Sequence, residues 1–276
     1  MSGSETHLDN TPQLRDEALC RSVLYGALSL AFHPPTLETW DELRSEKARL
    51  ALPQAAALLD SGKRTGNWEP VASEAAETSI DLAARMDDWM QTFQPLTLER
   101  LVSSYGHLFG HTAKGLICPY EAEYGQEGLF QQPRHIARVA GFYRAFGLTT
   151  REVERERADH ISCELEFLDF LSRKEAFALE RGEKVTLEET QKAIRLFLRD
   201  HLARFGRAFS RLLREQDPEG FFGKLGDLLF DFVTFECYRL RIQPGPAVLR
   251  LRSAEPDNVP MACGGESDLV QLETPE

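Results

Sequence analysis

Apolar residues recur at helical spacing along most of the chain, and this pattern predicts a helical protein. In residues 98–109 they follow the i, i+3, i+4, i+7 spacing without a break, and Thr97 supplies an N-cap. No segment longer than four residues alternates in the way that a half-buried strand requires. Other helices are expected over 15–31, from 37 to a kink or break near Pro53, after Pro70 and over 133–146.

The second half of the chain predicts three long helices. Asp159 is well placed to cap the first of them. Thr186 and Glu189 form a capping box for the second, which continues without interruption to about residue 212. The third, at about 221–240, is hydrophobic on nearly all sides, so it is expected to lie at the centre of the fold.

The composition of the two ends completes the domain organisation. Residues 1–13 are polar and are expected to be a disordered leader, while residues 243–276 are rich in Pro, Gly, Ser and acid and are expected to be a flexible tail. Hydrophobic residues make up 42% of the 276, enough for a large core. The prediction is an all-α protein of about eight or more helices over residues 14–242, as a single large domain or two tightly joined helical parts.

Charge and cysteine content exclude several classes of protein. The net charge of −12 argues against a nucleic-acid-binding surface, which needs clustered basic residues. The N-terminus lacks an apolar signal region, and no apolar run has the roughly 18 residues of a membrane span. The five cysteines are odd in number, scattered and without a C-x-x-C pair, which indicates reduced thiols. A cytoplasmic protein without an integral membrane segment is expected.

Residues 118–124, Cys-Pro-Tyr-Glu-Ala-Glu-Tyr, place two aromatic rings and two carboxylates close together in a predicted loop. Glu121 and Glu123 are two residues apart and can face the same way, as paired carboxylates do in acid–base catalysis or in binding guanidinium groups. The alternative is a solvated acidic loop. The flanking Tyr120 and Tyr124 favour arginine binding, because carboxylates beside aromatic faces suit a guanidinium group.

A second group of candidate residues is His107, His111 and Cys118. A spacing of four can place two imidazoles on one face of a helix, as in metal sites. Gly110 is expected to end the helix between them, however, so the pattern favours two half-exposed histidines over a metal site. The chain also lacks a Walker loop, a G-x-G-x-x-G and a G-x-S-x-G pattern, and neither a metal nor another cofactor is expected.

Four motifs in register resemble the TorD/DmsD family of cytoplasmic chaperones dedicated to molybdoenzymes. The order and spacing of these motifs hold from about residue 15 to residue 240. The motifs are Tyr105-x-x-Leu108-Phe109, Pro119-Tyr120-x-x-x-Tyr124, Val139-Ala140-Gly141-Phe142-Tyr143-x-x-Phe146-Gly147-Leu148 and Asp159-His160-x-x-x-Glu164-Leu165-Glu166-Phe167-Leu168.

The resemblance implies an all-helical protein that is not an enzyme. It would bind the twin-arginine signal peptide or the apo form of the catalytic subunit of a molybdenum-cofactor oxidoreductase, and hold it until cofactor insertion and export. A twin-arginine signal peptide (the leader of the partner enzyme) joins two arginines to an apolar segment. A protein that binds it therefore needs carboxylates, here Glu121 and Glu123, beside an apolar groove. By position in the motifs, the residues that would line or support this peptide site are Tyr105, Leu108, Phe109, Pro119, Tyr120, Tyr124, Asp159 and His160.

The chain departs from the family pattern at two places. Ala158 stands before the Asp-His pair, where the family often has proline, and Glu121 and Glu123 stand where the family often has small or apolar residues. The competing function is a small metalloprotein or hydrolase that uses His107, His111 and Cys118.

Overall fold

The computed structural model of the chain describes residues 10–62, 80–110, 115–125, 132–149 and 157–251. Within these ranges it has ten α-helices, one short 3-10 helix and no strand, so the all-α prediction is confirmed. The helices are α1 Thr11–Phe32, α2 Leu37–Arg44, α3 Glu46–Gly62, α4 Leu82–Gln91, α5 Leu98–Phe109, η1 Glu121–Glu123, α6 Gln132–Ala145, α7 Ile161–Arg181, α8 Lys184–Asp200, α9 Leu202–Gln216 and α10 Phe221–Arg239.

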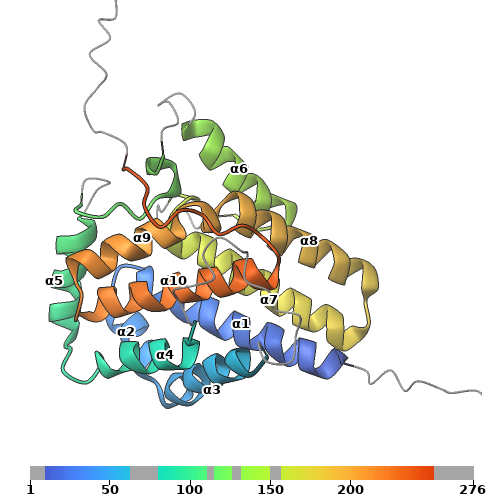
Figure 1. Cartoon of the computed structure of the whole chain (residues 1–276), viewed down its shortest axis with the longest axis horizontal. Helices are drawn as coiled ribbons and strands as arrows, with labels where there is room; N and C mark the ends of the chain where they lie inside the picture. Colours follow the sequence, from blue (N-terminus) through green and yellow to red (C-terminus); the bar gives the residue numbers. More distant parts are fainter. Residues whose placement is uncertain (1–9, 63–79, 111–114, 126–131, 150–156, 252–276) are drawn as a thin grey trace, which may run out of the picture.

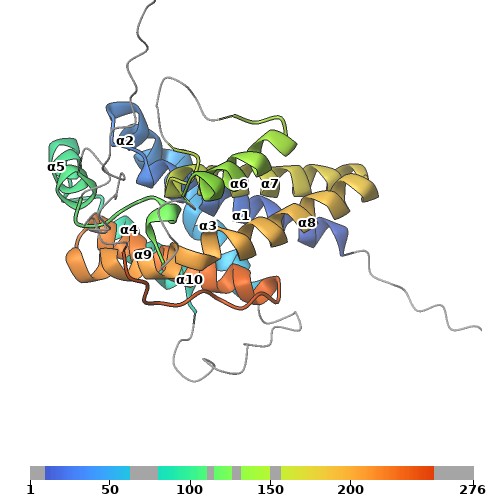
Figure 2. The ribbon, with the colours of Figure 1, turned by 90° about the horizontal axis from the view of Figure 1, so that it is seen from above.

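The long helices pack side by side around one core. Helix α1 packs most extensively against α7, and α10 packs most extensively against α9. In both ribbon views α1, α7 and α8 extend together to one side, while α5 stands at the opposite end (Figures 1 and 2). Helix α6 lies along the upper edge in Figure 1 and contacts η1. None of the described helices is both long enough and apolar enough to span a membrane.

Helix α10 has no exposed residue, in agreement with its all-round hydrophobicity. Its Leu225, Leu228 and Leu229 are wholly buried. It contacts the first helix, because the Tyr25 ring of α1 lies 4.7 Å from the Phe232 ring and the Tyr25 hydroxyl donates to a Glu236 oxygen at 3.1 Å. Buried side chains from α1 to α10 form one continuous hydrophobic cluster.

Short polar side chains begin several helices as the sequence predicts. Thr97 caps α5 by accepting a hydrogen bond from the Arg100 N–H. Gly182 ends α7 in a left-handed conformation, with φ of 67°, that a residue with a Cβ adopts only with strain. These predictions of helix ends are correct because a helix cap depends on residues that are close in sequence.

Two capping predictions are wrong. Helix α8 begins at Lys184, so Thr186 lies inside the helix and forms no capping box. Only two residues separate α7 from α8, and this short connection brings the helix start forward. Asp159 precedes the cap of α7 rather than forming it, because its carboxylate is bonded elsewhere and His160 is the N-cap.

Two helix breaks also differ from prediction. Of the kink or break expected near Pro53, the break does not occur there: the helix breaks at Ser45, and Pro53 lies inside α3. The single helix expected to run to about residue 212 is divided into α8 and α9 at His201, whose φ of −128° and ψ of −95° leave the helical region. No glycine or proline marks that second break, so its cause lies in contacts with distant residues.

The two ends of the domain extend beyond the predicted limits. Helix α1 begins at Thr11, within the segment expected as a leader. Residues 243–251, expected to begin the flexible tail, lie against the helices, where Arg207 donates to the Gly245 carbonyl at 2.7 Å and Gly125 donates to the Arg250 carbonyl at 3.2 Å. The predictions for residues 1–9 and 252–276 lie outside the described part of the chain.

Candidate functional site

The Cys-Pro-Tyr-Glu-Ala-Glu-Tyr segment is fastened to the start of α7 by backbone hydrogen bonds. The Ile161 N–H donates to the Pro119 carbonyl, and the Glu121 N–H donates to the Asp159 carbonyl, both at 2.9 Å. Tyr120 and His160 form an isolated antiparallel bridge. Two of the sequence motifs, about 40 residues apart, thus form one structural unit.

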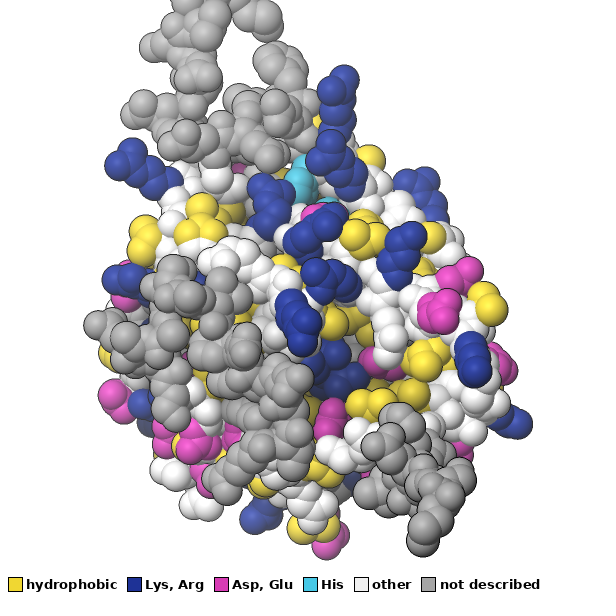
Figure 3. Space-filling model, turned by 45° about the vertical axis from the view of Figure 1, so that its right-hand side comes forward, with side chains coloured by type: hydrophobic (Ala, Val, Ile, Leu, Met, Phe, Trp, Pro, Cys, Tyr) yellow, Lys and Arg dark blue, Asp and Glu magenta, His cyan; other side chains and the backbone are white. Residues whose placement is uncertain are grey.

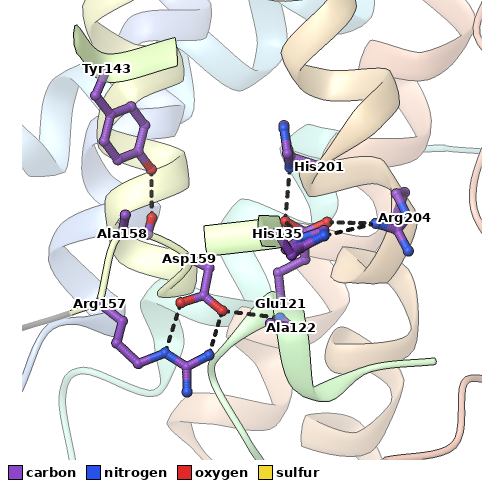
Figure 4. A network of polar contacts seen from close by, with 9 residues as sticks. All are labelled: Glu121, Ala122, His135, Tyr143, Arg157, Ala158, Asp159, His201 and Arg204. Carbon is purple, nitrogen blue, oxygen red and sulfur yellow. Dashed lines mark hydrogen bonds and ion pairs between the residues drawn. The ribbon is translucent and has the colours of Figure 1, made fainter. Parts of the chain in front are cut away.

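Asp159 is the polar centre of this unit. Its carboxylate is wholly buried and accepts hydrogen bonds from Arg157 Nε and Nη2, at 2.9 and 2.8 Å. It also accepts from the Ala122 N–H at 3.0 Å, which fastens η1 from a second direction (Figure 4). A buried carboxylate needs such partners, because the desolvation of an unpaired charge is costly.

His160 begins α7 and is also buried. Its Nδ1 accepts a hydrogen bond from the Ser162 N–H at 3.2 Å, which is the N-cap interaction. Burial, followed by the nearby charges of His33 and Arg157, lowers the pKa of His160 to about 3. The imidazole is therefore neutral at neutral pH.

Arg157 occupies an aromatic and acidic clamp at the rim of the unit. Its guanidinium carbon lies 4.5 Å from the centre of the half-buried Tyr120 ring. Its Nη1 pairs with Glu123 Oε1 at 3.0 Å, while its other nitrogens bind Asp159. Stacking on an aromatic face together with carboxylate pairing is the arrangement that suits a guanidinium group.

Glu121 points the opposite way, into a buried cluster with two histidines. Only 2% of Glu121 is exposed, and its Oε2 lies 2.6 Å from His135 Nε2 and 3.0 Å from His201 Nδ1. Arg204 Nη1 approaches the other oxygen at 3.4 Å (Figure 4). Burial raises the pKa of Glu121, but the close approach and the charges of His135 and His201 outweigh burial and lower it.

Glu164 of α7 adds a second buried acid beside this cluster. Burial raises its pKa well above the ordinary value, and the charges of Glu121 and Asp159 raise it further. Both effects favour the protonated, neutral form of the side chain. Glu164 belongs to the sequence motif, but nothing in its spacing predicted that it would be next to Glu121.

Glu121, His135 and His201 could together hold a metal ion. Each offers one ligand atom, and these atoms all lie within 4.8 Å of one another. Sequence reasoning missed both histidines, because they meet Glu121 only in the tertiary structure. One signal was available: His201 stands on the apolar stripe between Leu198 and Phe205, where a histidine needs a buried polar partner.

A hollow of about 800 Å³ opens beside this cluster, between α6 and the junction of α8 with α9. Lys and Arg side chains gather across the middle of the face in Figure 3, with histidine among them. A smaller hollow of about 200 Å³ lies on the other side of Arg204 and includes Glu121. The residues that line the larger hollow include His135, Arg138, Phe142, Arg199, His201 and Arg204.

The predicted site residues are divided between two environments. The structure brings Pro119, Tyr120, Glu121, Glu123, Tyr124, Asp159 and His160 into the unit described above. Leu108 and Phe109 are instead core residues, with 2% and 3% of their surface exposed. Tyr105 is half-buried, and its ring lies 4.8 Å from that of Phe109 and 6.0 Å from that of Phe222.

Only two members of the second candidate group, His107 and Cys118, lie in the described part of the chain. His107 is exposed on α5, and His111 lies outside the described residues. Cys118 is buried, and burial raises its pKa to about 12, so its thiol is protonated at neutral pH. A protonated, buried thiol is a poor metal ligand and a poor nucleophile.

Comparisons with known proteins agree with the motifs. The family model described as "Nitrate reductase delta subunit" matches residues 72–211. The perchlorate reductase assembly chaperone protein of Dechloromonas aromatica is 27% identical over 189 residues, which cover 68% of this chain and 75% of that protein. The selenate reductase assembly chaperone protein of Thauera selenatis is 31% identical over 152 residues, covering 53% of this chain and 72% of that protein.

A fourth comparison connects these relatives to the TorD proteins. The chaperone protein TorD of Photobacterium profundum is 29% identical over 150 residues, which cover 54% of this chain and 67% of that protein. The resemblance that the four sequence motifs indicated is thereby confirmed. This chain belongs to the family of the nitrate reductase delta subunit, which includes the TorD chaperones.

Proposed function

We propose that this protein is an assembly chaperone, not an enzyme, that acts in the cytoplasm on one molybdenum-cofactor oxidoreductase. It recognises the twin-arginine signal peptide or the apo form of the catalytic subunit, and holds that subunit until cofactor insertion and export. The names of the relatives support the first part, because two of them are assembly chaperones of perchlorate and selenate reductases.

The clamp around Arg157 is the observation that supports binding of a leader arginine. Tyr120 supplies an aromatic face, and Glu123 and Asp159 supply carboxylates, so the chain's own guanidinium is held on three sides. A leader arginine has the same chemistry as Arg157. It can bind beside Arg157 or replace it on Tyr120 and Glu123, which lie at the rim, while Asp159 stays buried.

The burial of Glu121 changes the role that we assign to it. With 2% of its surface exposed and two histidines against its carboxylate, Glu121 holds η1 in position from the buried side. Glu123, whose side chain is 21% exposed, is the member of the acidic pair that a peptide can reach. Buried Pro119, Tyr124 and His160 likewise hold Tyr120 and Glu123 in place.

Calorimetric titration with the leader of a molybdoenzyme encoded in the same genome tests this proposal. We expect micromolar or tighter binding, about −8 kcal/mol or stronger, which burial of a few apolar side chains and charge pairing can supply. A leader with both arginines changed to alanine should bind at least about tenfold more weakly, since charge-assisted bonds to carboxylates are worth roughly 1.5–3 kcal/mol.

Two variants of the chaperone locate the contact. Glu123→Gln should weaken binding of the natural leader but not of the alanine leader, whereas Glu215→Gln, an exposed control on α9, should leave both unchanged. Equal affinity for the two leaders would remove arginine capture from the mechanism. No binding of either leader, together with no binding of the apo catalytic subunit, would overturn the chaperone assignment for that client.

A further inference from the structure

We propose that Glu121, His135 and His201 form a binding site for one divalent transition-metal ion of the zinc type. The proposal is independent of the leader-binding function, and it involves different residues from His107, His111 and Cys118. Three separate segments supply the ligands: Glu121 begins η1, His135 lies in the first turn of α6, and His201 joins α8 to α9.

The ligand atoms already converge. Glu121 Oε2 lies between His135 Nε2, at 2.6 Å, and His201 Nδ1, at 3.0 Å. All three ligand atoms lie within 4.8 Å of one another. Around a tetrahedral zinc ion, bonds of about 2.0–2.2 Å place ligand atoms roughly 3.4 Å apart. The present separations, 2.6 and 3.0 Å to the Glu121 oxygen and at most 4.8 Å overall, lie on either side of that spacing.

His135 provides an independent reason to place a ligand here. Its Nε2 is buried and makes no hydrogen bond, although Glu121 Oε2 is only 2.6 Å away. The carboxylate oxygen therefore lies off the direction that a ring N–H would take. Buried polar atoms are rarely left without a partner, and two close ligand atoms that do not bond to each other suit a shared cation.

The types of ligand select the class of metal. Two imidazoles and one carboxylate suit zinc and its neighbours in the first transition series, whereas Mg²⁺ and Ca²⁺ prefer oxygen ligands alone. Three protein ligands leave a further coordination position open. Both histidines also line the hollow of about 800 Å³, which provides a route for the ion from solvent.

Arg204 is the neighbouring group that opposes a cation. Its Nη1 lies 3.4 Å from Glu121 Oε1 and 3.4 Å from His135 Nδ1, both long contacts. The Arg204 side chain is 39% exposed at the edge of both hollows, so its charge is partly screened by solvent. Arg204→Gln removes this positive charge and should strengthen metal binding several-fold.

The experiment uses the full chain without an affinity tag, stripped of metal with a chelator and dialysed against Zn²⁺. We expect one zinc per chain by elemental measurement, and a visible Co²⁺ spectrum typical of four or five ligands. His135→Asn and His201→Asn should each lower the affinity at least about tenfold, because even second-shell losses cost that much. The matched control His107→Asn, at an exposed histidine of α5, should keep wild-type binding.

A measurement on the unmodified chain guards against variants that fail to fold. Zinc should protect His135 and His201, but not His107, from acylation by diethyl pyrocarbonate as mapped by mass spectrometry. Absence of stoichiometric zinc would overturn the proposal. Zinc binding that survives both substitutions, or that protects neither buried histidine, would overturn it as well.

Discussion

His160 illustrates how one buried side chain couples the binding unit to pH. It caps α7 through Nδ1 and contacts Tyr120, with ring centres 5.2 Å apart. Its folded pKa of about 3 lies below the ordinary value of 6.5, chiefly because burial disfavours the charged form. Below about pH 6.5 the His160 imidazole is therefore protonated in the unfolded chain, whereas in the folded chain it is protonated only below about pH 3.

We predict that His160→Asn reduces the loss of stability in acid. As the pH falls from about 6.5 towards 3, His160 should lower the free energy of unfolding by up to about 1.4 kcal/mol per pH unit. Asparagine is a good N-cap and does not titrate, so it keeps the cap and removes this term. Urea unfolding at several pH values measures the difference in slope.

The exposed His107→Asn serves as the control and should keep the wild-type slope. If His160→Asn and the wild type lose stability in parallel between pH 6 and 4, burial of a neutral His160 is not the source of acid sensitivity.

At the scale of helices, the same residue type plays opposite roles at different positions. Gly182 ends α7 with φ of 67°, and its N–H donates to the Leu179 carbonyl. Gly141 lies inside α6 at an exposed position, and an added Cβ there would meet nothing within 4 Å. A left-handed residue favours glycine, whereas a helix interior disfavours it.

We predict opposite effects of the same substitution at these two glycines. Gly182→Ala should lower the free energy of unfolding by about 1–2 kcal/mol, the cost of a Cβ in the left-handed region. Gly141→Ala should raise it by roughly 0.5–1 kcal/mol, because alanine favours the helix. Chemical denaturation of both variants gives the signs, and a stabilising Gly182→Ala would contradict the assigned helix end.

The whole molecule is held together by contacts between helices that are far apart in the sequence. Arg21 pairs with Glu175 at 2.6 Å with both side chains buried, and Arg85 pairs with Asp231 at 2.8 Å. The rings of Trp40, Trp89, Phe93 and Phe221 also pack together, which joins the N-terminal helices to α10. These contacts favour one cooperative unit over two helical parts that unfold separately.

We predict that the domain unfolds in one transition. Trp40 and Trp89 are buried in the N-terminal half, so their fluorescence reports on that half, whereas far-UV circular dichroism reports on all helices. The two signals should change at the same urea concentration, as expected for one cooperative unit. Separate midpoints would support the alternative of two joined helical parts.

The local pattern of the sequence determined much of this structure. Apolar spacing over 98–109 predicted α5, and Thr97 predicted its cap. The hydrophobicity of 221–240 on nearly all sides predicted that α10 is buried. These features depend on neighbours within a few turns. The motifs that include Pro119, Asp159 and His160 also identified the family, since their order along the chain needs no knowledge of the fold.

Only the tertiary structure decided which way each acidic side chain points. Glu121 and Glu123 look equivalent in sequence, yet one is buried against His135 and His201 and the other pairs with Arg157 at the rim. His201 is 80 residues from Glu121, and the helix break that brings it there has no local signal. Burial of a charged group depends on its partners, and these partners meet only when distant segments pack together.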